Sequence, residues 1–178
     1  MKEDIREIIV SSEDLEDKIS SLGKKISKDY KGKDLMLIGV LKGSIMFMSD
    51  LAKNIDIPLT MDFMAVSSYG DSTESSGVVR INKDLDSSIE GKDVLIVEDI
   101  VDTGLTLNYL VDNLKSRGAN SIKICSLLDK PERRRVNVNI DYIGFQVPDE
   151  FVVGYGIDYA QKYRNLPYIA ILKEEAYS

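Results

Sequence analysis

The sequence contains no histidine and only one cysteine among 178 residues. The lack of histidine excludes triads, metal sites and general bases built on imidazole, so acid–base chemistry must fall to carboxylates, lysine or tyrosine. A single thiol provides no disulfide framework, and a reducing compartment fits. Cys125 lies in an apolar run at 122–128, which indicates a buried and inert thiol.

Long apolar runs are also missing. No run approaches the roughly 20 residues that a membrane-spanning helix requires, and the N-terminus, MKEDIREIIV, is charged from position 2. Basic residues are in the minority, with 23 Lys and Arg against 30 Asp and Glu and a formal net charge of -7. A negative surface disfavours general nucleic-acid binding, although it does not exclude a small anion site. We therefore expect a cytoplasmic protein that binds neither membrane nor nucleic acid.

What the sequence does contain is an alternation of strand and helix patterns. Its length and its 43% hydrophobic residues predict one domain, residues 1–178. A helix should begin at 11–14, because apolar residues then recur at helical spacing from Leu15 to Ile26. Further helices are predicted at 47–51 and 107–118, strands at 35–40, 60–66, 78–81, 94–97, 122–128 and 142–147, and short apolar runs at 151–153 and 168–172. This order favours an α/β fold with a mainly parallel central sheet, whose ligands gather at the carboxyl ends of the strands.

Residues 67–77 form a polar segment, SSYGDSTESSG, between two predicted strands. Its small polar side chains cannot contribute to a core, and its length is typical of a functional loop. We interpret it as a candidate lid.

The most informative segment joins three carboxylates to a glycine turn. Glu98, Asp99 and Asp102 follow the apolar strand at 94–97 within five positions. Carboxylates this crowded repel one another unless a positive charge or several hydroxyl donors lie between them, and a ribose diol with Mg²⁺ meets that need. The turn TGLT at 103–106, at the expected start of a helix, offers backbone N–H groups and hydroxyls to a phosphate monoester.

Two other interpretations of this segment stay open on spacing alone. The acids could belong to a solvated loop with a helix N-cap. The run LIVED at 95–99 also resembles the acidic pair of a two-component receiver domain. In that fold, however, the pair belongs on the first strand, and no Asp-Thr-Gly turn is expected after it.

Residues 97–107, VEDIVDTGLTL, closely resemble the phosphoribosyl pyrophosphate (PRPP) signature of type I phosphoribosyltransferases. Other motifs resemble the bacterial hypoxanthine-guanine subfamily in order and spacing: LKGS at 41–44, SYG at 68–70, LLDK at 127–130 and FVVGYGIDY at 151–159, with Arg164 beyond. The resemblance covers nearly the whole chain. It implies the type I phosphoribosyltransferase fold, with a mobile lid at about 67–77 and a small base-binding hood formed mainly by 130–178 with N-terminal residues.

The resemblance also implies which residues bind the pyrophosphate. Lys42 and Gly43 match a pyrophosphate-binding turn, in which the family often has a cis peptide between the positions of Leu41 and Lys42. Arg164 matches a second pyrophosphate contact, and Ser68 and Tyr69 match the start of the lid.

The ribose, its phosphate and the metal are assigned by the same resemblance. Glu98 and Asp99 match acids at the ribose hydroxyls and Mg²⁺, and Asp158 matches a further Mg²⁺ ligand, although a turn residue is the plainer interpretation of that acid. The residues that match the 5′-phosphate loop are Asp102, Thr103, Gly104, Leu105 and Thr106. Position 105 is Leu where some relatives carry Lys, so this loop must rely on backbone amides and hydroxyls.

Four residues match the part of the site that binds the base. Asp102 matches the proton partner of purine N7, Lys130 the donor to the exocyclic oxygen at C6, Phe151 the stacking ring and Val152 a backbone contact. A donor-only lysine favours a 6-oxopurine over a 6-aminopurine. From the residues alone, Lys130 could instead belong to a solvated basic loop with 133–135, and Phe151 could belong to the core.

The activity implied by the resemblance is purine salvage with Mg²⁺. The phosphoribosyl group of PRPP would pass to N9 of hypoxanthine or guanine, giving IMP or GMP and pyrophosphate, in a homodimer or homotetramer. Alternatives are an enzyme for xanthine or adenine, and a PRPP-sensing regulator of the same fold. A regulator should carry a basic surface or an added helix-turn-helix segment, and a chain of net charge -7 with no spare length favours the enzyme.

Overall fold

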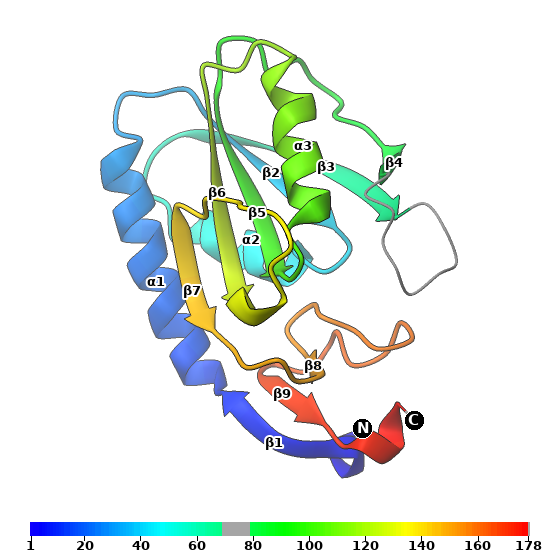
Figure 1. Cartoon of the computed structure of the whole chain (residues 1–178). Helices are drawn as coiled ribbons and strands as arrows, with labels where there is room; N and C mark the ends of the chain where they lie inside the picture. Colours follow the sequence, from blue (N-terminus) through cyan, green and yellow to red (C-terminus); the bar gives the residue numbers. More distant parts are fainter. Residues whose placement is uncertain (69–78, 178) are drawn as a thin grey trace.

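The computed structural model describes residues 1–68 and 79–177, and its central element is a six-stranded sheet of order β4-β3-β2-β5-β6-β7 (Figure 1). The strands are β2 (Leu35–Leu41), β3 (Leu59–Ser68), β4 (Val79–Lys83), β5 (Asp93–Val101), β6 (Ser121–Asp129) and β7 (Tyr142–Gln146). All neighbouring pairs are parallel except β3 and β4. The mainly parallel sheet that the sequence predicts is confirmed.

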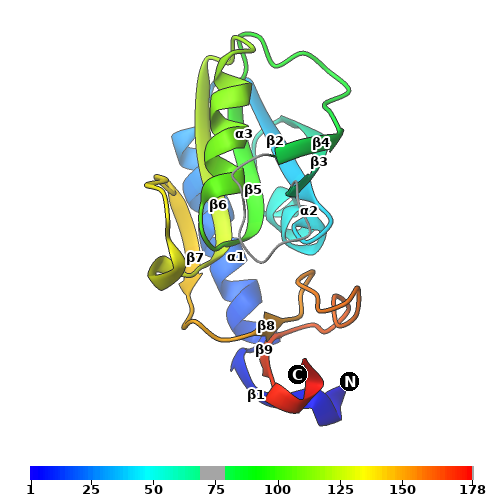
Figure 2. The ribbon, with the colours of Figure 1, turned by 45° about the vertical axis from the view of Figure 1, so that its right-hand side comes forward.

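Helices cover both faces of this sheet (Figure 2). On one face, α1 (Ser12–Asp29) and α2 (Ile45–Lys53) share a core with Leu95 and Val97 of β5. On the other face, α3 (Leu105–Lys115) packs with the alternate strand residues, such as Ile96. Because β5 is buried on both sides, its sequence is a continuous apolar run.

The predicted start of α1 is confirmed by a reciprocal capping box. The Ser11 hydroxyl accepts a hydrogen bond from the Asp14 backbone N–H at 3.1 Å, and the Asp14 carboxylate accepts one from the Ser11 backbone N–H at 3.3 Å. Two of the otherwise unpaired N–H groups at the helix start are thereby satisfied.

A second, three-stranded antiparallel sheet lies beyond the carboxyl ends of β5 and β6 (Figure 1). It consists of β1 (Ile5–Val10), β9 (Ile169–Leu172) and β8 (Val152–Val153), in that order. Short 3-10 turns, Lys2–Asp4 and Glu174–Ala176, flank it, and a third, Pro131–Arg133, follows β6. The termini therefore meet in this small sheet, and β1 is not among the predicted strands.

The predicted end of β5 differs from the structure. β5 continues to Val101, beyond its predicted end at residue 97, because its backbone goes on pairing with β6 after the apolar run stops. The predicted lid at 67–77 lies outside the described residues except for Ser67 and Ser68, which end β3. Within the described ranges, no helix is long and apolar enough to cross a membrane.

Candidate active site

The end of β5 and the loop after it surround a cavity of about 120 Å³. The residues lining it are Glu98, Ile100, Val101, Asp102, Thr103, Gly104, Thr106 and Leu107. Most members of the acidic segment and its glycine turn are thus brought to one place, at the carboxyl end of a central strand. Such strand ends are where ligands bind in parallel α/β sheets.

The loop at 102–106 ends in the start of α3. Gly104 is the N-cap with φ +82°, a left-handed conformation that glycine adopts without strain. Gly104 has no side chain to cap the helix start, the Thr103 hydroxyl accepts from the Leu105 backbone N–H at 3.4 Å, and the first turn carries no acid. A helix start without an acid beside a cavity suits an anion.

The basic segment after β6 forms hydrogen bonds with the backbone of the loop at 102–106. The Thr103 carbonyl accepts a hydrogen bond from the Arg135 backbone N–H at 2.9 Å. Arg134 donates to the Asp102 carbonyl at 3.2 Å and forms an ion pair with Asp129, which is 5% exposed. The support was not predicted, because it links residues from separate elements.

Glu98 and Asp99 carry negative charge that the protein compensates poorly. Burial, reinforced by the charge of Asp99, raises the pKa of Glu98 well above its ordinary value. Burial also raises the pKa of Asp99 to about 6. A divalent cation would relieve both charges, so this pair fits Mg²⁺. Among the described residues, no group of three acidic or cysteine side chains is placed to hold a metal ion by itself. Glu98, Asp99 and Asp158 would therefore bind Mg²⁺ together with oxygen atoms of the substrate, as is common for this ion.

The turn between β2 and α2 approaches Asp99 closely. The peptide between Leu41 and Lys42 is cis, as the resemblance implied. A Cβ atom at Gly43 would collide with the Asp99 carboxylate, and one at Gly156 would collide with the Gly43 carbonyl. The predicted pyrophosphate turn therefore contacts both the acidic strand end and the loop that precedes Asp158.

Replacing Gly43 with Ala should lower kcat/KM for PRPP by about 100-fold, because the added methyl must push either the turn or the Asp99 carboxylate out of place. Steady-state kinetics with varied PRPP would measure this. Gly32→Ala is the control: its φ of +78° should make the substitution destabilising, but a methyl there meets nothing within 4 Å, so kcat/KM for PRPP should stay unchanged. Unaltered kcat/KM in Gly43→Ala would show that the close approach has no role.

Asp158 and Arg164 lie together on the loop above this turn. Their side chains form an ion pair at 2.8 Å, and Arg164 donates to the Gly156 carbonyl at 2.6 Å. Gln161 joins the two predicted pyrophosphate cations, because its side-chain oxygen accepts from Lys42 at 3.2 Å and from Arg164 at 3.3 Å. Asp158 also accepts from the Gln161 backbone N–H at 2.8 Å, so the turn interpretation of Asp158 holds alongside the ion pair. No sequence motif pointed to Gln161.

Lys130 is held at the end of β6 and is not part of a solvated loop. It is 8% exposed, and its ammonium donates to the Glu150 carbonyl at 2.6 Å. Burial lowers its pKa, while the nearby carboxylates of Asp102 and Asp149 oppose the shift. A buried donor-only side chain at this position suits recognition of an oxygen atom.

Phe151 is 37% exposed, so the core interpretation is wrong. Its ring stacks on Tyr177 with centroids 4.7 Å apart and meets Tyr159 edge to face at 5.2 Å. Val152, next in the chain, lies in β8 and pairs with Ile171 of β9. The structure thus joins these two predicted base contacts to the small sheet.

Asp102 is near Lys130 but has a closer partner, Arg133. The Arg133 Nε atom lies 2.8 Å from the Asp102 Oδ1 atom in an ion pair, and Arg133 also pairs with Asp149. The Oδ1 atom is shielded from solvent, and among the described residues no donor is aligned to form a hydrogen bond with it. The side chain as a whole is 44% exposed, so the carboxylate can be reached by a substrate while it pairs with Arg133.

The arrangement defines a class of protein. A parallel sheet carries an acidic strand end, a glycine turn at a helix start and a cis-peptide turn beside it. The family model "Phosphoribosyl transferase domain" matches residues 6–160, which is most of the chain. The chain belongs to the phosphoribosyltransferase family.

Similar proteins narrow this class to the hypoxanthine-guanine type, an enzyme of purine salvage. The hypoxanthine-guanine phosphoribosyltransferase of Bacillus subtilis is 55% identical over 177 residues, covering 99% of this chain and 98% of that protein. A crystal structure of hypoxanthine phosphoribosyltransferase from Staphylococcus aureus matches with a TM-score of 0.98 at 55% identity, covering 100% of this chain and 97% of that one. The bifunctional protein TilS/HprT of Listeria monocytogenes is 56% identical over 178 residues, and the chain spans 28% of its length.

Proposed function

We propose that this chain transfers the phosphoribosyl group of PRPP to N9 of hypoxanthine or guanine, giving IMP or GMP and pyrophosphate. The observation that carries the proposal is the meeting of two sets of residues at one strand edge. The phosphate loop and Glu98 surround one cavity. The buried Lys130 lies near Asp102 and donates to the carbonyl of Glu150, the residue before Phe151. The phosphate loop suits PRPP, and Lys130 with Phe151 suits a flat base with an oxygen at C6.

The proposed roles follow from these positions. The amides of 103–106 hold the 5′-phosphate, while Glu98 and Asp99 face the ribose diol and hold Mg²⁺ with Asp158. When bound, Mg²⁺ supplies positive charge to the departing pyrophosphate. Lys42 and Arg164 bind the same pyrophosphate from the turn and the loop on either side of Gly43. Positioning and charge neutralisation then provide most of the acceleration as C1′ becomes cationic.

The base is held from the opposite side. Phe151 stacks on the purine, Val152 contacts its edge through the backbone, and Lys130 donates to the oxygen at C6. Asp102 takes the proton from N7 while N9 attacks C1′. The hood over the base consists mainly of 130–178 together with N-terminal residues. We further propose a cytoplasmic homodimer or homotetramer.

The test is pyrophosphate release from PRPP and Mg²⁺ with hypoxanthine, guanine, xanthine and adenine in parallel. We expect turnover with hypoxanthine or guanine and at least about 100-fold less turnover with adenine. Adenine carries a hydrogen-bond donor at C6, where the Lys130 ammonium, itself a donor, needs an acceptor. Preference for xanthine would correct the base assignment. Silence with all four bases despite PRPP binding would overturn the proposal in favour of a PRPP sensor.

A further inference from the structure

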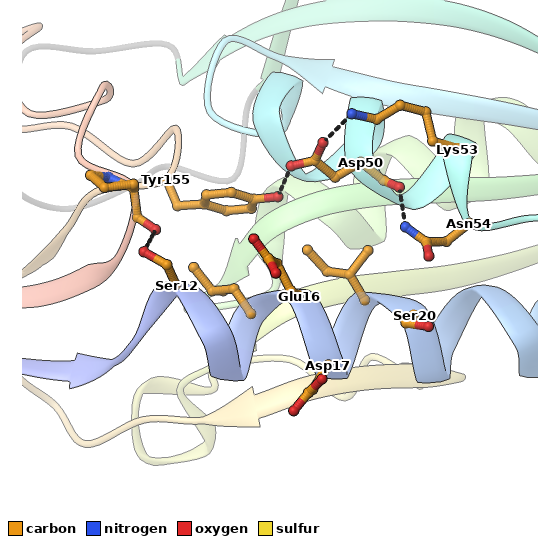
Figure 3. A pocket seen from close by; sticks show the side chains of 11 residues that line it. Ser12, Glu16, Asp17, Ser20, Asp50, Lys53, Asn54 and Tyr155 are labelled. Atoms are coloured by element: carbon orange, nitrogen blue, oxygen red, sulfur yellow. Dashed lines mark hydrogen bonds and ion pairs between the residues drawn. The ribbon is translucent and has the colours of Figure 1, made fainter.

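A cleft of about 580 Å³ lies between the two helices on one face of the sheet and the loop that carries Asp158. Its walls come from α1, from α2 and from Tyr155, as Figure 3 shows. Across this cleft the Tyr155 hydroxyl donates a hydrogen bond to the Asp50 carboxylate on α2. Asp50 also forms an ion pair with Lys53 at 2.6 Å. None of these residues belongs to the proposed catalytic or binding set.

The pair joins two segments that both contact the pyrophosphate turn. Asp50 lies on α2, which begins at Ile45, directly after the turn at 42–44. Tyr155 lies between Gly154 and Gly156, and the Gly156 backbone packs so closely on the Gly43 carbonyl that a Cβ atom would not fit. The hydrogen bond therefore closes a ring that runs from the turn along α2, across to Tyr155, and back to the turn through Gly156.

The charges of the pair favour one stable arrangement. Burial and the bond to Asp50 raise the pKa of the Tyr155 hydroxyl, so it remains a donor. Burial alone would raise the pKa of Asp50, but the hydrogen bonds from Lys53 and Tyr155 outweigh it and place that pKa below its ordinary value. A neutral donor thus meets an ionised acceptor, which is a stronger contact than a bond between two neutral groups.

The base contacts have a separate support. Val152 and Val153 pair with Ile171 and Ala170 of β9, and the Leu172 backbone N–H donates to the Phe151 carbonyl at 3.0 Å. These backbone bonds hold residues 151–153 independently of the Tyr155 hydroxyl. Losing the hydroxyl should therefore disturb the segment at 156–158 more than the segment at 151–153.

We propose that Tyr155 and Asp50 are positioning residues that fix the loop at 156–158 over the pyrophosphate turn, and so set PRPP affinity separately from base affinity. The inference rests on the proposed function, because it assumes that this turn binds the pyrophosphate of PRPP. Neither residue touches the substrate, and each acts through the backbone beside it.

The test is steady-state kinetics of Tyr155→Phe and Asp50→Ala, with PRPP and hypoxanthine varied in turn. We expect KM for PRPP to rise about tenfold in each variant, while KM for hypoxanthine at saturating PRPP changes by less than about twofold. In the double variant the effect should not exceed that of the larger single variant, since both changes remove the same bond.

Tyr142→Phe is the matched control. The Tyr142 hydroxyl donates to Asp29 at 2.7 Å, so this variant also removes a tyrosine–aspartate bond, but at the start of β7 and the end of α1. Its Tm should fall by an amount similar to that of Tyr155→Phe without any change in KM for PRPP. Equal KM values in Tyr155→Phe and the unmodified enzyme, or a parallel rise of both KM values, would overturn the inference. An unmodified protein that turns over none of the bases would instead contradict the proposed function.

Discussion

Replacing Asp102 with Asn should lower kcat by about 10²- to 10⁴-fold while KM for PRPP changes only a few-fold. The amide has the size of the carboxylate but cannot accept a proton from N7, so the chemical step loses its base. The phosphate loop should keep its shape, because Arg134 holds the Asp102 backbone carbonyl and not its side chain. Single-turnover rates at saturating PRPP and hypoxanthine would measure the loss.

Asp149→Asn provides the control for charge. Asp149 contacts the same arginine as Asp102, with the Arg133 Nη1 atom lying 3.4 Å from its Oδ1 atom. Its removal changes the net charge near Arg133 and Lys130 by the same amount but leaves the proposed proton acceptor intact. We expect kcat to stay within about threefold, as for an exposed ion pair of small energy. Equal losses in the two variants would assign the effect to charge around Lys130 and remove Asp102 from proton transfer.

The sheet and helices could be predicted because each depends on a local pattern. Continuous apolar runs marked the buried parallel strands, and the Ser11 capping box with its periodic residues marked α1. β1 could not be predicted in this way. Of its residues IREIIV, only Val10 is buried, Ile5 and Ile9 are partly buried and the middle three are exposed, so no alternation marks a strand. Its partner β9 lies more than 150 positions further on.

The candidate site could be predicted residue by residue, but its internal contacts could not. Motif and resemblance named the acids, the glycine turn and Lys130. The ion pair of Arg133 with Asp102, the bridging role of Gln161 and the bond between Tyr155 and Asp50 each join segments far apart in the chain. Such contacts depend on how side chains meet after folding, which composition and spacing do not specify.

Replacing Asp99 with Asn should stabilise the metal-free protein and abolish its response to PRPP and Mg²⁺. The folded state raises the pKa of Asp99 from 3.8 to about 6. Because the folded state raises the pKa of this acid, its contribution to stability is fully present below the unfolded-state pKa. That contribution is lost as the pH rises through the folded-state pKa of about 6. At pH 7.5 the ionised carboxylate therefore costs stability, and the amide removes a cost of about 1–3 kcal/mol. For a chain of this size each kcal/mol shifts Tm by about 2–4 °C.

Thermal unfolding at pH 5.0 and 7.5, with and without PRPP and Mg²⁺, would separate these effects. The Tm difference between Asp99→Asn and the unmodified protein should be positive at pH 7.5 and smaller at pH 5.0, since the carboxylate is then mostly protonated. Its backbone bond from Ile100 can persist, because the amide oxygen also accepts.

Asp93→Ala, at the start of the same strand, should do the opposite. That carboxylate oxygen accepts from Asn120 at 2.9 Å and Ser121 at 2.6 Å, so its loss should lower Tm while ligand stabilisation remains. A lower Tm in Asp99→Asn, or a retained shift with PRPP and Mg²⁺, would mean that Asp99 is a structural acid. Opposite signs at the two ends of one strand would instead show that stability is given up at Asp99 for the sake of binding, because there, unlike at Asp93, the fold leaves negative charge for a ligand to neutralise.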